Sequence, residues 1–271
     1  MAAKKQSNWW HFVNSDGEFT AEAFEQVSRL YFPIANEAGM RSWVSPQLQG
    51  SPASSHNEYL GLPLSAEDLS NSLVHRGFWI AEESGVPFSL SSISPDGLKA
   101  HLGKVSAAVR AGPGWFSITK SAAGRFSVRA TLWSPADVDD KLEVMQVEVT
   151  NTSRRKLEFN AYAAIPLFAR SADNLRDHRH VTALLNRVQL NAHGVTVCPT
   201  MSFDERGHRE NRVRYSALAF GPANLRPEGI WATQESFLGE GGSFAAPAAV
   251  WRREIKPAMS LREMQGQEAL G

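Results

Sequence analysis

The densest group of side chains able to bind a polar ligand lies between residues 170 and 180. This segment reads Arg-Ser-Ala-Asp-Asn-Leu-Arg-Asp-His-Arg-His and follows an apolar run at 161–168. Guanidinium groups and carboxylates placed together suit a polyhydroxylated ligand, because each can form paired hydrogen bonds with adjacent hydroxyls. The candidate binding residues are therefore Asp173, Asn174, Arg176, Asp177, His178, Arg179 and His180.

Two other interpretations of this segment stay open. A self-neutralising surface loop would have the same composition. A metal site would use His178 and His180, which share one face if the segment is extended, with Asp177 beside them. A third ligand at a defined spacing is needed for a zinc-type site, and none follows from the spacing, so we predict no metal.

A second polar group spans residues 202–211 and contains the adjacent carboxylates Asp204 and Glu205. Successive residues of an extended segment point to opposite faces, so these two cannot easily flank one glycosidic bond. We predict a turn with internal pairing of arginines and carboxylates.

Residues 239–244 are rich in glycine but lack the spacing of a dinucleotide or phosphate loop, which favours a tight loop with positive φ values. Three tryptophans, Trp79, Trp115 and Trp133, lie within apolar runs, and we assign them to the core.

The elements that carry these groups are mostly strands. Alternation of apolar and polar residues with period two recurs in four runs, at 126–132, 145–150, 157–163 and 213–219. In the third run, Leu157, Phe159, Ala161 and Ala163 form the apolar face. Turn signals separate the runs at 122–124, 135–140, 151–155 and Gly207. Such strands predict an all-β fold of two stacked antiparallel sheets.

Helical signals are few. One short helix is predicted from the spacing of Phe24, Val27 and Tyr31 behind a cap at Thr20, and a second turn of helix begins at Ser65. Residues 50–57, 83–97 and 221–229 are predicted to be surface loops.

The overall composition excludes several classes of partner. The 28 basic and 28 acidic residues cancel, so no net charge attracts nucleic acid or an anionic membrane. Cys198 is the only cysteine, which excludes an internal disulfide and suits a reducing compartment. No signal peptide or membrane-length apolar run is evident, so we expect a cytoplasmic protein with no membrane or nucleic-acid partner.

Several strings resemble, in order, the amino-terminal region of the cellobiose phosphorylase family of inverting glycoside phosphorylases. The resemblance extends to 1,2-β-oligoglucan phosphorylases and cyclic β-1,2-glucan synthases and covers about residues 30–271. The strings that carry it are 31–40, 65–69 with Phe78 and Trp79, 164–181, 202–208, 239–244 and 266–271.

The resemblance implies a large antiparallel β-supersandwich with one or two short helices, followed in relatives by a helical linker and an (α/α)6 barrel. Relatives are usually homodimers that cleave a β-glucosidic bond with inorganic phosphate, a hexosyl transfer that gives sugar 1-phosphate. The catalytic acid belongs to the barrel, so no catalytic residue is expected in this chain. Phosphate is a co-substrate of the parent enzyme, and no cofactor is expected.

The resemblance also implies a division of the chain. Residues 1–30 are expected to form an N-terminal extension with a first strand or helix, and residues 31–271 a supersandwich truncated before the barrel. Two segments depart from the pattern of relatives, residues 54–58 and 73–77, and these departures leave the sugar specificity open.

Three hypotheses for function follow. The first is a phosphorylase domain that is inactive alone. It supports dimerisation and lines the sugar-acceptor side of a catalytic barrel, and the ligand is a β-linked gluco-oligosaccharide. The second is a stand-alone carbohydrate-binding module that uses the segment 170–180. The third, an independent hydrolase, would need an acid pair drawn from Asp204, Glu205 or Glu240, and no convincing pair is present.

Overall fold

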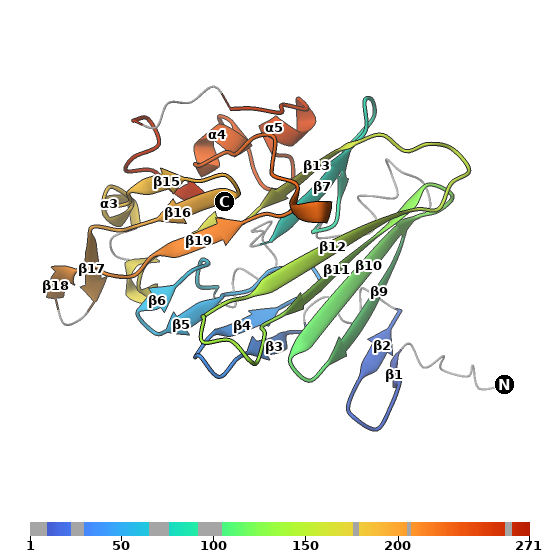
Figure 1. Ribbon diagram of the computed structural model, residues 1–271, viewed down its shortest axis with the longest axis horizontal. Coiled ribbons are helices and arrows are strands. Elements are labelled where there is room, and N and C mark those ends of the chain that lie inside the picture. The colour runs from blue at the N-terminus through green and yellow to red at the C-terminus, as the bar shows by residue number, and fades with distance from the viewer. Residues whose placement is uncertain are drawn as a thin grey trace, which may run out of the picture.

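A computed structural model describes residues 10–22, 30–64, 76–91, 105–175, 179–204, 207–257 and 262–271 of the chain. In this part of the molecule almost all regular structure is β, as the alternation predicts, and the few helices are short (Figure 1). The strands are divided among six antiparallel sheets rather than the simple pair that the pattern suggested. The predicted helix around Phe24 and Val27 and the turn beginning at Ser65 lie outside the described residues.

The largest sheet has six strands in the order β1-β2-β9-β10-β11-β12. Its strands are β1 (Trp10–Phe12), β2 (Phe19–Ala21), β9 (Val105–Gly112), β10 (Trp115–Ala122), β11 (Phe126–Trp133) and β12 (Val144–Asn151). Strands β9 to β12 form a meander of three hairpins. Gly124, with φ of 73°, allows the tight turn between β10 and β11.

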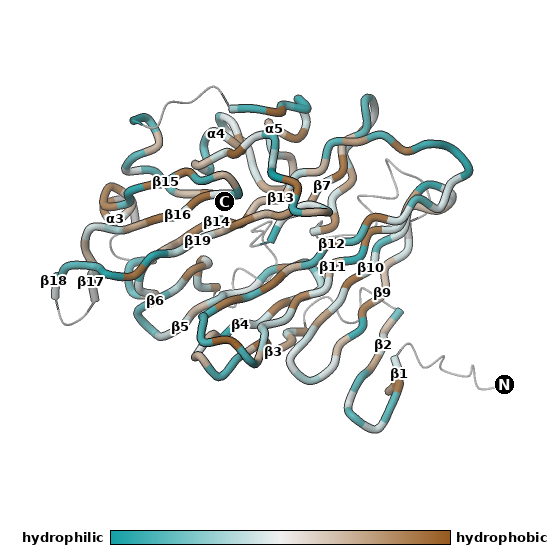
Figure 2. The backbone as a smooth tube through the Cα atoms, viewed as in Figure 1, coloured by the Kyte–Doolittle hydropathy of each residue, from teal (hydrophilic) through white to brown (hydrophobic). Residues whose placement is uncertain are grey.

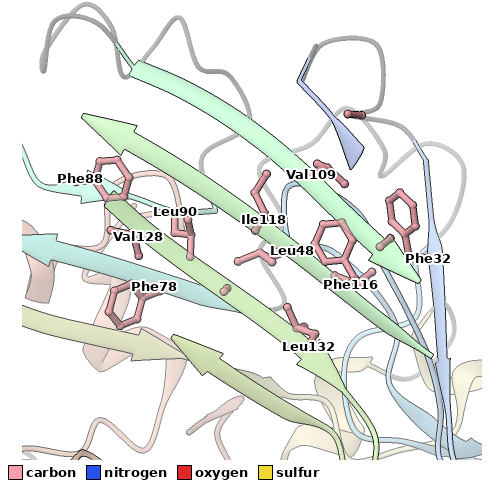
Figure 3. Close-up of a cluster of buried hydrophobic side chains, with 14 of the residues drawn as sticks. Phe32, Leu48, Phe78, Phe88, Leu90, Val109, Phe116, Ile118, Val128 and Leu132 are labelled. Carbon is pink, nitrogen blue, oxygen red and sulfur yellow. The ribbon is translucent and has the colours of Figure 1, made fainter. Parts of the chain in front are cut away.

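One face of this sheet covers the main hydrophobic core (Figure 3). Phe116, Ile118 and Val128 from β10 and β11 are fully buried against side chains of the second layer, including Phe78 and Phe88. Figure 2 shows the matching alternation of hydrophobic and hydrophilic residues along these strands. The opposite face of the sheet carries mainly polar residues, most of them partly or fully exposed.

The second layer contains two smaller sheets. One has the order β3-β4-β5-β6, and the other has the order β13-β7-β8. Their strands are β3 (Phe32–Ala35), β4 (Arg41–Val44), β5 (Ala53–Ser55), β6 (Glu58–Tyr59), β7 (Gly77–Ala81), β8 (Phe88–Ser89) and β13 (Asn160–Ala164). Strand β7 is buried on both sides: Phe78 and Ile80 face the main core, whereas Trp79 and Ala81 face a second core.

The remaining elements are short helices and short sheets. The helical elements are η2 (Ala172–Leu175), α3 (Arg179–Ala183), η3 (Pro222–Asn224), α4 (Gln234–Leu238) and α5 (Ala248–Trp251). The strands are β14 (Pro166–Leu167), β15 (Val188–Leu190), β16 (Gly194–Val197), β17 (Met201–Asp204), β18 (Gly207–Glu210), β19 (Tyr215–Leu218) and β20 (Ala269–Leu270). They pair as β14-β20, β15-β16-β19 and β17-β18. Helices α4 and α5 cover the second core, whereas the strands β14, β15, β16 and β19 enclose a third core.

Three of the four predicted strand runs are confirmed with the expected buried face, in β11, β12 and β19. The third run is a strand, but its predicted face is wrong. In β13, Tyr162 and Ala164 are buried, whereas Ala161 and Ala163 are exposed. Tyr162 lies opposite Trp79 of β7, so pairing turns it toward the second core.

Two predicted surface loops are also wrong in part. Residues 50–53 are buried and lead into β5, and β8 within the stretch 83–97 is buried as well. The segment 221–229 is a partly exposed loop containing η3, as predicted.

Candidate functional site

Arg170 is the anchor of the polar segment that the sequence singles out. Its side chain is almost completely buried and stacks on the ring of Phe168, with the guanidinium carbon 4.4 Å from the ring centroid. The guanidinium donates hydrogen bonds to the Phe168 carbonyl at 2.8 Å, to the hydroxyl of Thr182 in α3 at 2.8 Å and to the carboxylate of Glu268 at 2.5 Å. One side chain therefore ties the end of β14, helix α3 and the residue before β20 together.

The backbone of Arg170 also brings a distant turn to this segment. The Tyr59 amide donates to the Arg170 carbonyl at 2.9 Å, and the Arg170 amide donates back to the Tyr59 carbonyl at 3.3 Å. The amide of Ala172 donates to the carbonyl of His56 at 3.5 Å. The turn between β5 and β6 consequently lies beside η2, although more than a hundred residues separate them in the sequence.

A small polar cluster forms where these two segments meet. The Ser171 hydroxyl donates to Asp173 at 3.3 Å and lies 3.5 Å from the amide oxygen of Asn57. The Asp173 carboxylate is 3.6 Å from Nε2 of His56. Ser171 is buried, but the side chains of His56 and Asp173 are 70% and 35% exposed. A fixed base thus presents an imidazole and a carboxylate toward solvent, both able to hydrogen-bond a polar ligand.

The predicted binding residues fall into three groups. Asp173 belongs to the cluster, and Asn174 is buried in η2, so it supports the turn rather than facing a ligand directly. Residues 176–178 lie outside the described residues, which leaves Arg176, Asp177 and His178 as predictions. Arg179 and His180 begin helix α3, and the positions of their side chains are not described.

The extended geometry that placed His178 and His180 on one face does not apply to His180, because residues 179–183 are helical. Among the residues that the structure describes, no group of three histidine, cysteine or acidic side chains is placed to hold a metal ion.

The second polar group forms the hairpin β17–β18, and η2 packs against β17. Its base is held by Asn211, which donates to the carbonyls of Pro199 and Val213 at 2.9 and 2.8 Å and accepts from the Ser202 hydroxyl. The predicted turn is present, with Gly207 at φ of 97°. Amide and hydroxyl contacts hold the base of the hairpin, and Arg212 forms an exposed ion pair with Glu210 at its end.

A carboxylate also lies in the β5–β6 turn, at Glu58. It accepts from Ser54 and lies 3.4 Å from the ammonium group of Lys141. Burial, and then the negative charge of Glu58, raise the pKa of Tyr215 in β19. The Tyr215 phenol is therefore neutral at physiological pH.

The glycine-rich segment after α4 is a tight loop, as predicted. Gly239 and Gly241 have φ of 77° and 66°, and Phe244 anchors the loop in the second core. Helix α4 has only five residues.

His56 and Asn57 were not predicted as site residues from the sequence. The only available signal was that residues 54–58 depart from the loop of similar proteins, and nothing in the local pattern placed this turn beside Asp173. That placement depends on the pairing of Tyr59 with Arg170.

The layered antiparallel sheets, with a long meander packed on two smaller sheets, define a β-supersandwich. Residues 100–263 match the family described as glycosyl hydrolase 94, supersandwich domain. The chain belongs to this family, a carbohydrate-active family of which the supersandwich is one domain. A search of curated proteins gives no match. None of the helices in the described ranges is long and apolar enough to cross a membrane.

Proposed function

We propose that this chain is the supersandwich part of an inverting glycoside phosphorylase that acts on β-glucosides, and that it serves the sugar-acceptor side of the active site. The observation that carries the proposal is the clamp at Arg170, which holds both ends of a polar segment on a rigid base. A rigid base lets a loop meet a ligand without a large loss of conformational entropy. Membership in a glycoside-active family supports a sugar as the ligand.

In the proposed enzyme the chemistry takes place in a separate (α/α)6 barrel. An acid of that barrel protonates the leaving glycosidic oxygen while inorganic phosphate attacks the anomeric carbon from the opposite face, which yields an inverted sugar 1-phosphate. This chain contributes no catalytic group. Its contribution is binding, through Asp173, Arg176, Asp177, His178, Arg179 and His180, with Asn174 supporting the turn and His56 added by the structure. Homodimerisation of the parent enzyme and a cytoplasmic location are part of the same proposal.

The test is kinetics in the synthesis direction, in an assembly that carries the barrel. Acceptor and sugar 1-phosphate are varied separately for wild type, Asp173→Ala and Arg176→Ala. Losing a charge-assisted contact to sugar hydroxyls costs about 1.5 to 3 kcal/mol, so kcat/KM for the acceptor falls roughly tenfold to hundredfold. The value for sugar 1-phosphate changes little, because phosphate is held in the barrel.

Arg212→Ala is the matched control, since Arg212 is an exposed arginine of the neighbouring hairpin that pairs only at the surface with Glu210. If all three substitutions have equal, small effects on both substrates, the segment is a solvated surface loop that does not bind the acceptor.

The second candidate function is a stand-alone carbohydrate-binding module. The exposure of His56 and Asp173 in the chain itself favours it, because these groups are accessible without a partner domain. Calorimetric titration of the purified chain with β-linked gluco-oligosaccharides separates the two. Binding that Asp173→Ala abolishes, in the absence of any barrel, would support the module.

A further inference from the structure

Two tryptophans lie side by side on the exposed face of the six-stranded sheet. Trp115 begins β10 and Trp133 ends β11, and the two residues are directly paired across the strands. Their neighbours Phe116 and Leu132 are fully buried in the main core, so alternation places both tryptophans on the opposite face. Both side chains are half-buried rather than buried, which corrects the prediction that they belong to the core.

The indole of Trp115 lies against the backbone of β9. Gly112 is its partner across that strand pair, and a Cβ at this position would be 2.5 Å from Nε1 of Trp115. Only glycine leaves room for the ring to lie down on the sheet. The Nε1 side of the indole therefore lies close to the backbone of β9, and the half-buried side chain leaves part of its apolar surface accessible.

The rows next to the tryptophans are polar across the width of the sheet. The first row runs from Thr20 through Arg110, Ser117 and Thr131 to Gln146, each residue paired with the next. The Thr131 hydroxyl lies 3.3 Å from that of Ser117. Strands β9 to β12 lie next to one another along their whole lengths (Figure 1), so the row crosses the strands without a break, with Ser117 buried at its centre.

The charges on this surface are paired with each other. Arg110 forms an ion pair with Glu18, and Arg129 forms one with Glu148. The face is therefore close to neutral and offers no excess charge to an acidic or basic macromolecule. The pair of aromatic side chains can contact apolar C–H groups, and the neutral hydrogen-bonding groups beside it can bind hydroxyls. The face is therefore complementary to an uncharged sugar chain with apolar C–H faces and equatorial hydroxyls.

We propose that the face around Trp115 and Trp133 binds a neutral β-linked gluco-oligosaccharide, separately from the polar segment 170–180. Sugar rings pack on the two indoles, and hydroxyls exchange hydrogen bonds with Thr131 and Gln146. Neighbouring strands are about 4.8 Å apart, similar to the length of one pyranose unit, so successive rings can follow successive strands. The site serves to hold a long glycan, independently of any reaction.

The test is calorimetric titration of the chain with a cello-oligosaccharide and with a 1,2-β-glucan oligomer. Trp133→Ala is expected to weaken binding about tenfold or more, and Trp133→Phe to retain most of it, because a smaller flat ring remains. Thr131→Val, which removes one hydroxyl without changing shape, is expected to weaken binding a few-fold. Circular dichroism checks that each variant is folded.

Two matched controls make the result specific. Trp251 in α5 is a tryptophan with 43% exposure elsewhere on the surface, and Trp251→Ala should leave binding unchanged. Arg212→Ala, an exposed change beside the hairpin β17–β18, should also leave it unchanged. Failure of the proposed acceptor site would show instead in the acceptor kinetics of Asp173→Ala and Arg176→Ala with the barrel present, so the two failures are distinguishable.

Absence of binding by the wild-type chain, or binding that Trp133→Ala leaves intact, would overturn the proposal and leave the tryptophans as a pair that stabilises the hairpin ends. Light scattering tests whether a second copy of the chain, rather than a sugar, contacts this face. A wild-type dimer that Trp133→Ala converts to a monomer, with no effect of either sugar, would identify the face as a contact between two copies and equally overturn the proposal.

Discussion

The guanidinium of Arg170 donates a hydrogen bond to the hydroxyl of Thr182 across 2.8 Å, and this contact joins the first residue of the polar segment to helix α3, in which the segment ends. Both side chains are buried, so neither group can replace the contact with water. The same guanidinium reaches Glu268, which precedes the last strand. The geometry of the candidate site is therefore coupled to the packing of β14 and β20.

Replacing Arg170 by methionine is expected to lower the free energy of unfolding by about 3 kcal/mol. The change removes the ion pair with Glu268, which is 26% exposed, and the hydrogen bond to Thr182. Thr182→Val removes the hydrogen bond from Arg170 and should cost about 1 kcal/mol. Urea denaturation measures both values. Losses below about 0.5 kcal/mol for both variants would show that the clamp does not stabilise the fold.

A second buried ion pair ties the layers of the sandwich together. Arg76 donates to both oxygens of Glu143 at 2.5 and 2.8 Å and also to the hydroxyl of Ser42 at 2.7 Å. Arg76→Met and Glu143→Gln should each lower the free energy of unfolding by about 3 kcal/mol, because each leaves the other group buried without its partner.

A double-mutant cycle on this pair should give a coupling free energy of about 2 kcal/mol. The exposed pair Arg129 and Glu148, on the outer face of the sheet, is the matched control and should give less than about 0.5 kcal/mol. Equal coupling in both pairs would contradict the assignment of stability to burial.

Lys120 lies in β10 on the face that covers the main core and is fully buried. Burial lowers its pKa from 10.5 to about 7. Between pH 7 and 10.5 the unfolded chain therefore binds more protons at this residue than the folded chain does. Buried Lys120 destabilises the folded state, and this destabilisation decreases as the pH rises through this range. The free energy of unfolding therefore increases with pH.

Lys120→Met should stabilise the protein at pH 7 by an amount on the order of 4 kcal/mol. The advantage over wild type should shrink by about 1.4 kcal/mol per pH unit and disappear near pH 10.5. Comparison of the two proteins by urea denaturation at several pH values cancels the titration of other groups, including Tyr215. A difference that stays constant from pH 7 to 10 would mean that Lys120 keeps its ordinary pKa in the folded state.

The purified chain is expected to show no phosphate-dependent cleavage of cellobiose, cello-oligosaccharides or 1,2-β-glucan oligomers. The reason is that the proposed chemistry needs an acid supplied by the barrel. Detection of sugar 1-phosphate after prolonged incubation is the measurement. Release above the level of a heat-denatured sample would place a catalytic acid in this chain.

The local sequence was sufficient to predict the strands with strong alternation. Strands β11, β12 and β19 combine β-branched or aromatic residues on one face with polar residues on the other, so the buried face follows from the pattern alone. The position of the polar segment after an apolar strand, and the positive φ values of the loop at Gly239, were predictable for the same local reasons.

Only the tertiary structure decided which face of β13 is buried and which distant groups meet at the site. Alanines alternate with larger residues in β13 and bury little area, so pairing with Trp79 of β7 determines its orientation. His56 reaches Asp173 because Tyr59 pairs with Arg170, a contact between residues far apart in the sequence. Trp115 lies on the solvent side because its neighbours Phe116 and Ile118 fill the core. Long-range pairing and competition for core space are properties of the folded chain, which a local pattern does not contain.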